Sequence, residues 1–190
     1  FEYKRSQRGN GLAVTGFRGS QNQTIIFQNR SGNTPVVEVA DDSFCNSSTE
    51  EAILTEGIAS IGRNAFSGCD KLHQVVLPIS IEEINDSAFE NCRNLKSVSL
   101  PGALKTIGNA AFKGTGLRTI AIPESVFWIG NGVVADCQLL EHVTIPSNMD
   151  KIPEHMFEGC INLKKVELHE RLNEIGERAF FGCSSLDFIV

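Results

Sequence analysis

One short stretch of the sequence holds three side-chain types that enzymes use. Residues 61–78, IGRNAFSGCDKLHQVVLP, contain Cys69, Asp70 and His73 close together. A cysteine near a base and an orienting carboxylate can act as a nucleophile, because the base draws the proton from the thiol. The same cysteine can instead be a small side chain that fills the core. The rest of the sequence must decide between these interpretations.

The stretch is one copy of a repeat with a period of 22 or 23 residues. Copies begin at residues 36, 58, 81, 104, 126, 149 and 172. The copy from 36 is degenerate, because its cysteine, Cys45, comes two places early. The copy from 104 is one residue shorter than its neighbours, and the last copy is incomplete. A fixed period of this length indicates a solenoid of stacked coils.

Aligning the copies places phenylalanine and cysteine in two columns. The first column is Phe44, Phe66, Phe89, Phe112, Val134, Phe157 and Phe180, and the second is Cys69, Cys92, Thr115, Cys137, Cys160 and Cys183. A cysteine that recurs once per coil, and is replaced once by threonine, is typical of a small buried side chain. Disulfides within the column are disfavoured, because the side chains of stacked, in-register residues point the same way. Only Cys45 lies off the column, and we expect it to be the accessible thiol.

Each coil carries the pattern of a short strand followed by a turn. Leu95, Val98 and Leu100 have the spacing LxxVxL, which puts Val98 and Leu100 on one face of a strand. Prolines at 78, 101, 123 and 146 follow these segments and end the pairing, because proline has no N–H to donate. A second extended piece, such as Ile58 to Ile61, leads into glycine-rich turns. The pattern predicts one parallel strand per coil.

The motif Ile-Gly-x-x-Ala-Phe-x-Gly-Cys-x-x-Leu-x-x-Val-x-Leu-Pro resembles the BspA-like leucine-rich repeat proteins over residues 36–190. The resemblance implies a β-rich, right-handed leucine-rich repeat solenoid of about seven coils with its sheet on the concave side. Residues 1–35 are similar to the entry segment of that family and are expected to form a short β cap over the first coil. The family consists of exported or cell-surface proteins that bind other proteins, host components among them.

Composition and motifs argue against several other functions. The net charge is −6 and no basic cluster occurs, which disfavours nucleic acid as a partner. No run of about 18 apolar residues is present, so we do not expect an integral membrane protein. We find none of the common catalytic or cofactor-binding motifs. The four histidines fall at different repeat positions, so we expect neither a metal site nor a cofactor.

Candidate protein-binding residues are those that break the polar pattern of outward positions. Phe127 and Trp128 stand where the other coils carry mostly polar residues, which marks them as possible interface anchors. Alternatively, one of these rings folds inward to fill the volume lost where Val134 replaces phenylalanine. The outward side of the strands is a second candidate surface, comprising Gln74, Val76, Ser97, Ser99, Thr119, Ala121, His142, Thr144, Lys165, Glu167 and Phe188. That strip is small, mostly neutral and flat, which suits a protein surface better than a small molecule.

The last coil also departs from the pattern. Phe181 stands where other coils carry small or charged residues, and the sequence stops at Val190 within a strand. Because an uncapped solenoid edge invites aggregation, we expect further chain or a partner to cover it. Together the features predict a non-enzymatic protein-binding module of a secreted or cell-surface protein, with adhesion or host and matrix binding as its role. The alternative is a structural spacer with no ligand of its own.

Overall fold

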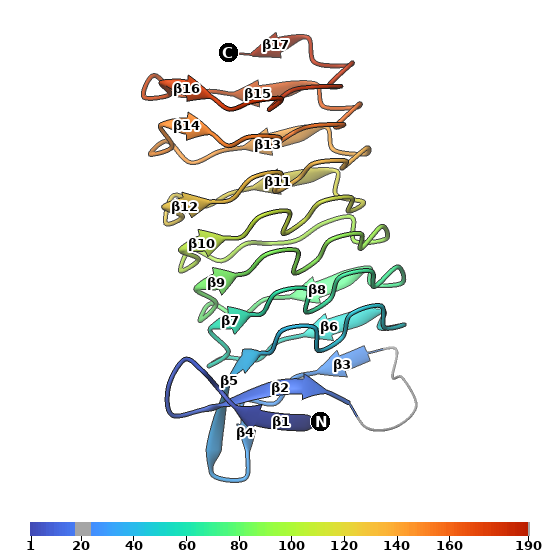
Figure 1. The fold of residues 1–190 in the computed structure, drawn as a ribbon, viewed down its shortest axis with the longest axis vertical. Coiled ribbons are helices and arrows are strands. Elements are labelled where there is room, and N and C mark those ends of the chain that lie inside the picture. The colour runs from blue at the N-terminus through green and yellow to red at the C-terminus, as the bar shows by residue number, and fades with distance from the viewer. Residues whose placement is uncertain (18–23, 190) are drawn as a thin grey trace.

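The computed structural model of the protein describes residues 1–17 and 24–189 and shows a stack of β-coils (Figure 1). The predicted solenoid of stacked β-coils is confirmed. Every regular element in the described residues is a strand. These are β1 (Glu2–Arg5), β2 (Leu12–Gly16), β3 (Thr24–Ile26), β4 (Arg30–Ser31), β5 (Thr34–Val39), β6 (Glu51–Ile53), β7 (Ser60–Ile61), β8 (Gln74–Val76), β9 (Glu83–Ile84), β10 (Thr106–Ile107), β11 (Thr119–Ala121), β12 (Trp128–Ile129), β13 (His142–Thr144), β14 (Lys151–Ile152), β15 (Lys165–Glu167), β16 (Glu174–Ile175) and β17 (Phe188–Ile189).

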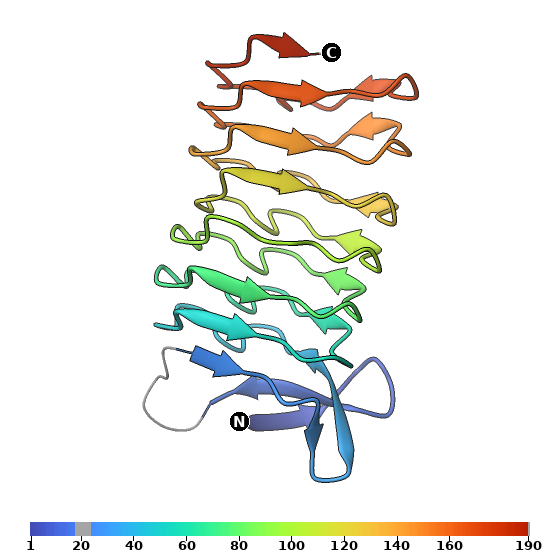
Figure 2. The ribbon, with the colours of Figure 1, turned by 180° about the vertical axis from the view of Figure 1, so that it is seen from behind.

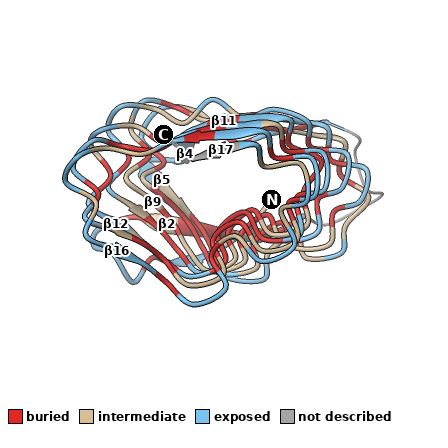
Figure 3. Ribbon diagram, turned by 90° about the horizontal axis from the view of Figure 1, so that it is seen from above, coloured by how far each residue is buried: buried red, intermediate tan, exposed pale blue. Residues whose placement is uncertain are grey.

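Each complete coil has three walls. The front wall carries the three-residue strands β3, β6, β8, β11, β13 and β15 and the two-residue strand β17, which Figure 2 shows from their outer side. The back wall carries the two-residue strands β7, β9, β10, β12, β14 and β16. The third wall, which we call the turn wall, consists of tight turns around the phenylalanine column. Seen along the stack, the walls enclose one continuous buried interior (Figure 3).

Stacked phenylalanine rings fill that interior. The rings of Phe44, Phe66, Phe89 and Phe112 follow one another with centroids 5.4 Å apart and nearly parallel planes. All four are buried. The stack resumes between Phe157 and Phe180 at 5.2 Å. A single coil could not bury such a ring, so each coil depends on its neighbours for its core.

At the break in this stack, two other residues restore the lost volume. Val134 is fully buried and replaces a phenylalanine, which leaves space in the interior. Val133 and Met156 stand where most other coils carry alanine, and both are also fully buried. Larger side chains of the turn wall therefore fill the lost volume, and the aromatic side chains of the back wall do not contribute to it.

The cysteine column lies beside the phenylalanine column. The thiols of Cys69, Cys92, Cys137, Cys160 and Cys183 each lie 3.0–3.1 Å from the carbonyl oxygen of the phenylalanine-column residue one coil earlier, to which they donate. All six cysteines are free. Burial raises the pKa of Cys137 to about 11 and also raises the pKa values of the other column thiols. Such protonated thiols are poor nucleophiles, so the column is structural.

The turn wall holds the coils in register by backbone bonds. The amides of Phe66 and Phe89 donate to the carbonyls of Ala88 and Ala111 in the next coil, both at 2.8 Å. Two residues per coil, placed two positions before and after the phenylalanine, have positive φ angles, as Asn64 and Gly68 do. This backbone turns the chain sharply on both sides of the ring, which points the ring inward.

One expected front strand does not form. Residues 97–99 carry no strand and pair with neither β8 nor β11, so the front sheet is split into β3-β6-β8 and β11-β13-β15-β17. The prediction of a strand around Val98 and Leu100 was therefore wrong for this coil. The cause lies in the next coil, which lacks one residue in the turn before β11. There Gly116 lies so close to the carbonyl of Arg93 that a Cβ atom would collide with it.

The N-terminal residues cover the first coil. Strands β1 and β2 form an antiparallel hairpin, and β2 pairs in parallel with β5. The ring of Phe1 stacks on Phe27 with centroids 5.5 Å apart, and Phe27 meets Phe44 edge to face at 5.4 Å. We propose that residues 1–35 act as the cap that the solenoid needs at this end. No helix in the described residues is long and apolar enough to cross a membrane.

A substitution in the phenylalanine column tests the packing account. Phe89→Ala should lower the free energy of unfolding by about 3–5 kcal/mol, because the ring is fully buried between two others. Phe127→Ala is the matched control, since the same change at an exposed ring should cost less than about 0.5 kcal/mol. Urea unfolding of both variants measures the two values. Equal losses would mean that the column is not the core.

Thiol labelling tests the cysteine column. At neutral pH, a pKa of about 11 in place of the ordinary 9.0 lowers the thiolate fraction of Cys137 about a hundredfold. Mass spectrometry after iodoacetamide treatment should therefore show Cys45 modified first and Cys137 modified only after denaturation. Rapid labelling of Cys137 in the native protein would contradict a buried column.

Candidate protein-binding surfaces

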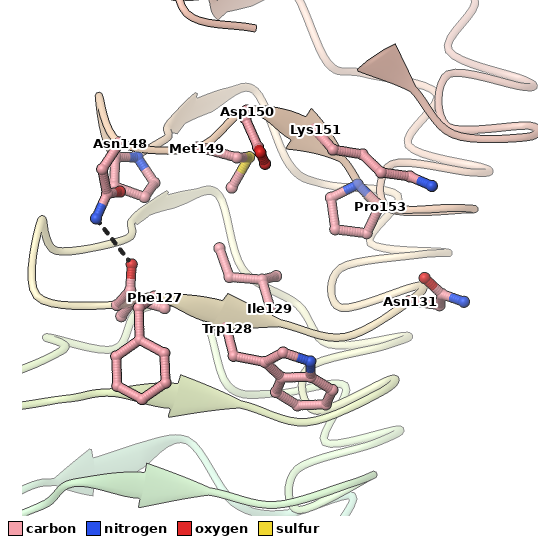
Figure 4. A pocket seen from close by; sticks show the side chains of 11 residues that line it. Phe127, Trp128, Ile129, Asn131, Asn148, Met149, Asp150, Lys151 and Pro153 are labelled. Carbon is pink, nitrogen blue, oxygen red and sulfur yellow. Dashed lines mark hydrogen bonds between the residues drawn. The ribbon is translucent and has the colours of Figure 1, made fainter. Parts of the chain in front are cut away.

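The aromatic pair of the back wall lies on the surface. Phe127 is 73% exposed and Trp128 is 47% exposed. Their counterparts in the preceding coil are Lys105 and Thr106, which are ordinary surface residues. The alternative in which one of these rings fills the space beside Val134 is not what the structure shows. In Figure 4 both rings extend from β12 toward the strand of the preceding coil.

The back sheet is interrupted directly beside this pair. Strand β12 pairs with β10 on one side, but no hydrogen bond joins β12 to β14 in the described residues. In the other coils the carbonyls equivalent to Phe127 and Ile129 accept bonds from the next coil, as Lys105 and Ile107 do. Figure 1 shows that β12 and β14 stand farther apart than the paired strands below them.

Pro153 explains the interruption. The residue at this place in each coil donates its N–H to the preceding coil, at 2.9 Å for Gly130 and 2.8 Å for Gly176. Ala40 and Asn85 also keep this bond, at 2.8 and 3.0 Å, so a side chain does not prevent it. Proline has no N–H, and Ile129 therefore lacks the donor that its counterparts receive. The sequence itself indicates this break, because Ile152 is followed by proline where most coils have Ile-Gly.

The interruption opens a pocket of about 380 Å³, which we call the window. Its walls are formed by Phe127, Trp128 and Ile129 on one side and by Met149, Asp150 and Lys151 on the other (Figure 4). At one end Asn148 Nδ2 donates to the carbonyl of Val126 at 3.4 Å. At the other end the amide of Gly132 donates to Glu154 at 2.9 Å. The window is thus closed along the strands at both ends and open to solvent on its outer side.

The charges around the window are predominantly negative. Lys151 forms an ion pair with Glu174 at 2.7 Å, and this hydrogen bond, with the nearby charges of Glu154 and Asp150, raises the pKa of the lysine. Asp150 has no cation within ion-pair distance in the described part of the chain. Because Lys151 is already neutralised by Glu174, the window offers an uncompensated carboxylate to whatever enters it.

The front-wall strip is exposed as expected. Thr119, His142 and Lys165 lie side by side in register, and so do Ala121, Thr144 and Glu167. Lys165 Nζ donates to Glu167 Oε1 at 2.6 Å, a bond that lowers the pKa of the glutamate and cancels both charges. Gln74, Val76, Ser97 and Ser99 are also exposed, but the split in the front sheet separates them from the rest of the strip.

The C-terminal candidates lie elsewhere. Phe181 is 59% exposed on the turn wall, and the guanidinium of Arg178 lies 4.0 Å from the centre of its ring. Arg178 also donates to Glu158, so the ring is partly covered by a charged network. The side chain of Phe188 lies outside the described part of the structure. The candidates therefore occupy three separate walls and form no single surface.

The histidines and acidic side chains near these surfaces form no metal-binding cluster in the described residues. Among the described residues, no three histidine, cysteine, aspartate or glutamate side chains lie close enough to hold a metal ion. His142 has Thr119 and Lys165 as its strand neighbours, which supply neither a nucleophile nor an orienting acid. The residues that sequence reasoning missed are Ile129, Met149, Asp150 and Pro153 of the window.

Comparison with known proteins identifies similar sequences and folds. The family described as BspA type Leucine rich repeat region matches in six copies over residues 15–141 and 83–190. No curated protein sequence matches the chain. A leucine-rich repeat protein from Bacteroides ovatus is 30% identical with a TM-score of 0.92, and the match covers 100% of this chain and 51% of that one. This chain thus spans about half the length of that protein.

A second solved structure is matched over most of its own length. The leucine-rich repeat protein of T. pallidum is 30% identical with a TM-score of 0.91, and the match covers 98% of this chain and 87% of that protein. A leucine-rich repeat protein from Bacteroides capillosus, 19% identical with a TM-score of 0.53 over 67% of this chain and 90% of that one, shares the fold alone.

Trp128, the single tryptophan, reports directly on the back wall. Because its side chain is about half exposed, its fluorescence should be red-shifted relative to a core tryptophan and should be quenched by iodide in the native protein. Denaturation should therefore change the quenching constant only modestly. A blue-shifted emission that iodide does not reach would place the ring inside the solenoid and would contradict the exposed pair.

Proposed function

Because the chain belongs to the BspA-type leucine-rich repeat family, we propose that it is a non-enzymatic module that binds another protein. The observation that carries the proposal is the exposed pair Phe127 and Trp128, which stands beside a pocket on a wall whose other exposed residues are mostly polar. Large aromatic side chains are the usual anchors of protein interfaces, because they bury much area at small cost in side-chain entropy.

The front-wall strip complements this anchor as an extended surface. Thr119, Ala121, His142 and Thr144 present small or neutral side chains on a rigid sheet. Such a surface has little conformational freedom to lose when a partner covers it. In this proposal the aromatic pair gives affinity to one contact, and the strip, Phe181 and Phe188 provide additional contacts on other walls.

We further propose that the module acts outside the cytoplasm, in a secreted or cell-surface protein. Family membership supports this location. The thiols of the cysteine column do not oppose it, because they are largely buried, their pKa values are raised and they donate to carbonyl oxygens. Host or matrix proteins are the partners to test first, with adhesion as the consequence of binding.

Binding to purified extracellular-matrix proteins tests the proposal. The chain, immobilised on a biosensor, should bind at least one member of a panel saturably, and Trp128→Ala should weaken that binding at least tenfold, in keeping with an anchor residue. Ile79→Ala is the matched control, because Ile79 is 75% exposed and lies outside the candidate surfaces. Its variant should bind like the wild type.

Two outcomes would contradict the proposal. Saturable binding that Trp128→Ala and Ile79→Ala leave equally intact would remove the aromatic pair from the interface. Absence of saturable binding across the panel would favour the alternative function, a structural spacer. The ring stack and turn-wall bonds would then serve only to hold neighbouring domains apart.

A further inference from the structure

The window presents hydrogen-bonding groups that the fold itself leaves unused. On the β12 side, the carbonyls of Phe127 and Ile129 accept no bond within the described chain. On the β14 side, the amides of Asp150 and Lys151 donate none, although the equivalent amides of Asn173 and Glu174 both donate to the preceding coil. One wall therefore offers acceptors and the facing wall offers donors.

This pair of walls matches the main chain of a peptide. A peptide backbone carries N–H groups that suit the carbonyls of Phe127 and Ile129, and carbonyls that suit the amides of Asp150 and Lys151. An unpaired strand edge readily accepts an added strand for this reason. Here two facing edges border the same opening, so an inserted backbone would be bonded on both sides.

The closed ends limit what can enter. The strands that border the window are only two residues long, and the bonds at Val126 and Gly132 close the stack on either side. A long strand could not lie across these closures. A few extended residues at the tip of a loop could enter from the solvent side, with Ile129 and Met149 behind them.

The negative charge around the window favours basic side chains in such a loop. Asp150 is uncompensated, and Glu154 adds a second carboxylate nearby. A basic side chain next to the inserted backbone would find both carboxylates, whereas an acidic one would meet repulsion.

We propose that the window binds a short, extended, basic loop of a partner protein, whose backbone completes the interrupted back sheet. This inference rests on the proposed protein-binding function and specifies how one contact is made. Ile129 and Met149 supply the apolar contacts of the inserted segment, and Phe127 and Trp128 form the β12 edge beside it. Pro153 is a positioning residue, because it keeps the window open by lacking the N–H that would close it.

Peptide selection tests the inference. Phage displaying random seven-residue loops closed by a disulfide would be selected on the full chain. We expect the enriched loops to contain lysine or arginine and no proline at their centre. N-methylation of the central amides of a synthetic loop should weaken binding at least tenfold, because it removes the donors to Phe127 and Ile129. N-methylation near the disulfide should have little effect.

Variants of the chain provide the second arm. Pro153→Ala restores an N–H where Ala40 shows that alanine is accepted, so it should close the window and weaken binding of the selected loop at least tenfold. Its melting temperature should be unchanged or higher, which separates loss of the site from loss of the fold. Asp150→Asn should weaken binding several-fold, and Glu170→Gln, an exposed carboxylate elsewhere, should not.

The outcomes separate this inference from the broader function. Three results would overturn the proposal that the window binds a loop. No loop is enriched, the selected loops bind Pro153→Ala as tightly as the wild type, or central N-methylation does not weaken their binding. If matrix-protein binding still depends on Trp128 in those cases, the binding function stands without the inserted loop. If matrix-protein binding is also absent, both proposals fail.

Discussion

The stacking of one phenylalanine per coil is the interaction on which the rest of the structure depends. The repeated 5.4 Å spacing between ring centroids requires each coil to lie directly over the previous one. That alignment brings each column thiol under the carbonyl of the preceding phenylalanine position, and it also aligns the amides of the turn wall. The rings supply the buried apolar area, and the bonds between coils satisfy the polar backbone that encloses it.

This arrangement explains why the solenoid tolerates two interruptions. The front sheet is broken at residues 97–99 and the back sheet between β12 and β14, which are different coils and different walls. At both levels the turn-wall bonds continue: the amide of Ser87 donates to the carbonyl of Asn109, and the amide of Gly132 donates to the carbonyl of Glu154. The groups left unpaired lie near the surface, where water can bind them, so each interruption costs less than a buried loss would. A coil that is hydrogen-bonded to its neighbours on two walls can therefore lose these bonds on the third.

The sequence predicts the regular features because they are periodic. The phenylalanine and cysteine columns, the coil length and the front strands follow from a pattern repeated in most copies, and the structure has them all except the strand near Val98. The exceptions arise from single residues whose effect falls on a neighbouring coil. The coil from 104 lacks one residue in the turn around Gly116, and residues 97–99 of the previous coil form no strand. Pro153 removes one donor, and the consequence appears at Ile129. A pattern within one coil does not reveal such effects between coils.

The position of the window within this rigid stack bears on what it can do. Its two edges are fixed by coils that remain paired on the turn wall, and β12 and β14 are each paired on their outer sides. The unused carbonyls and amides are therefore held in place before any partner arrives. A binding site that is already formed loses little conformational entropy on association, so a small contact can contribute more affinity than its area alone suggests. Pro153 removes one hydrogen bond of the back sheet and so creates the opening. The bonds that hold the neighbouring coils together on the turn wall remain intact.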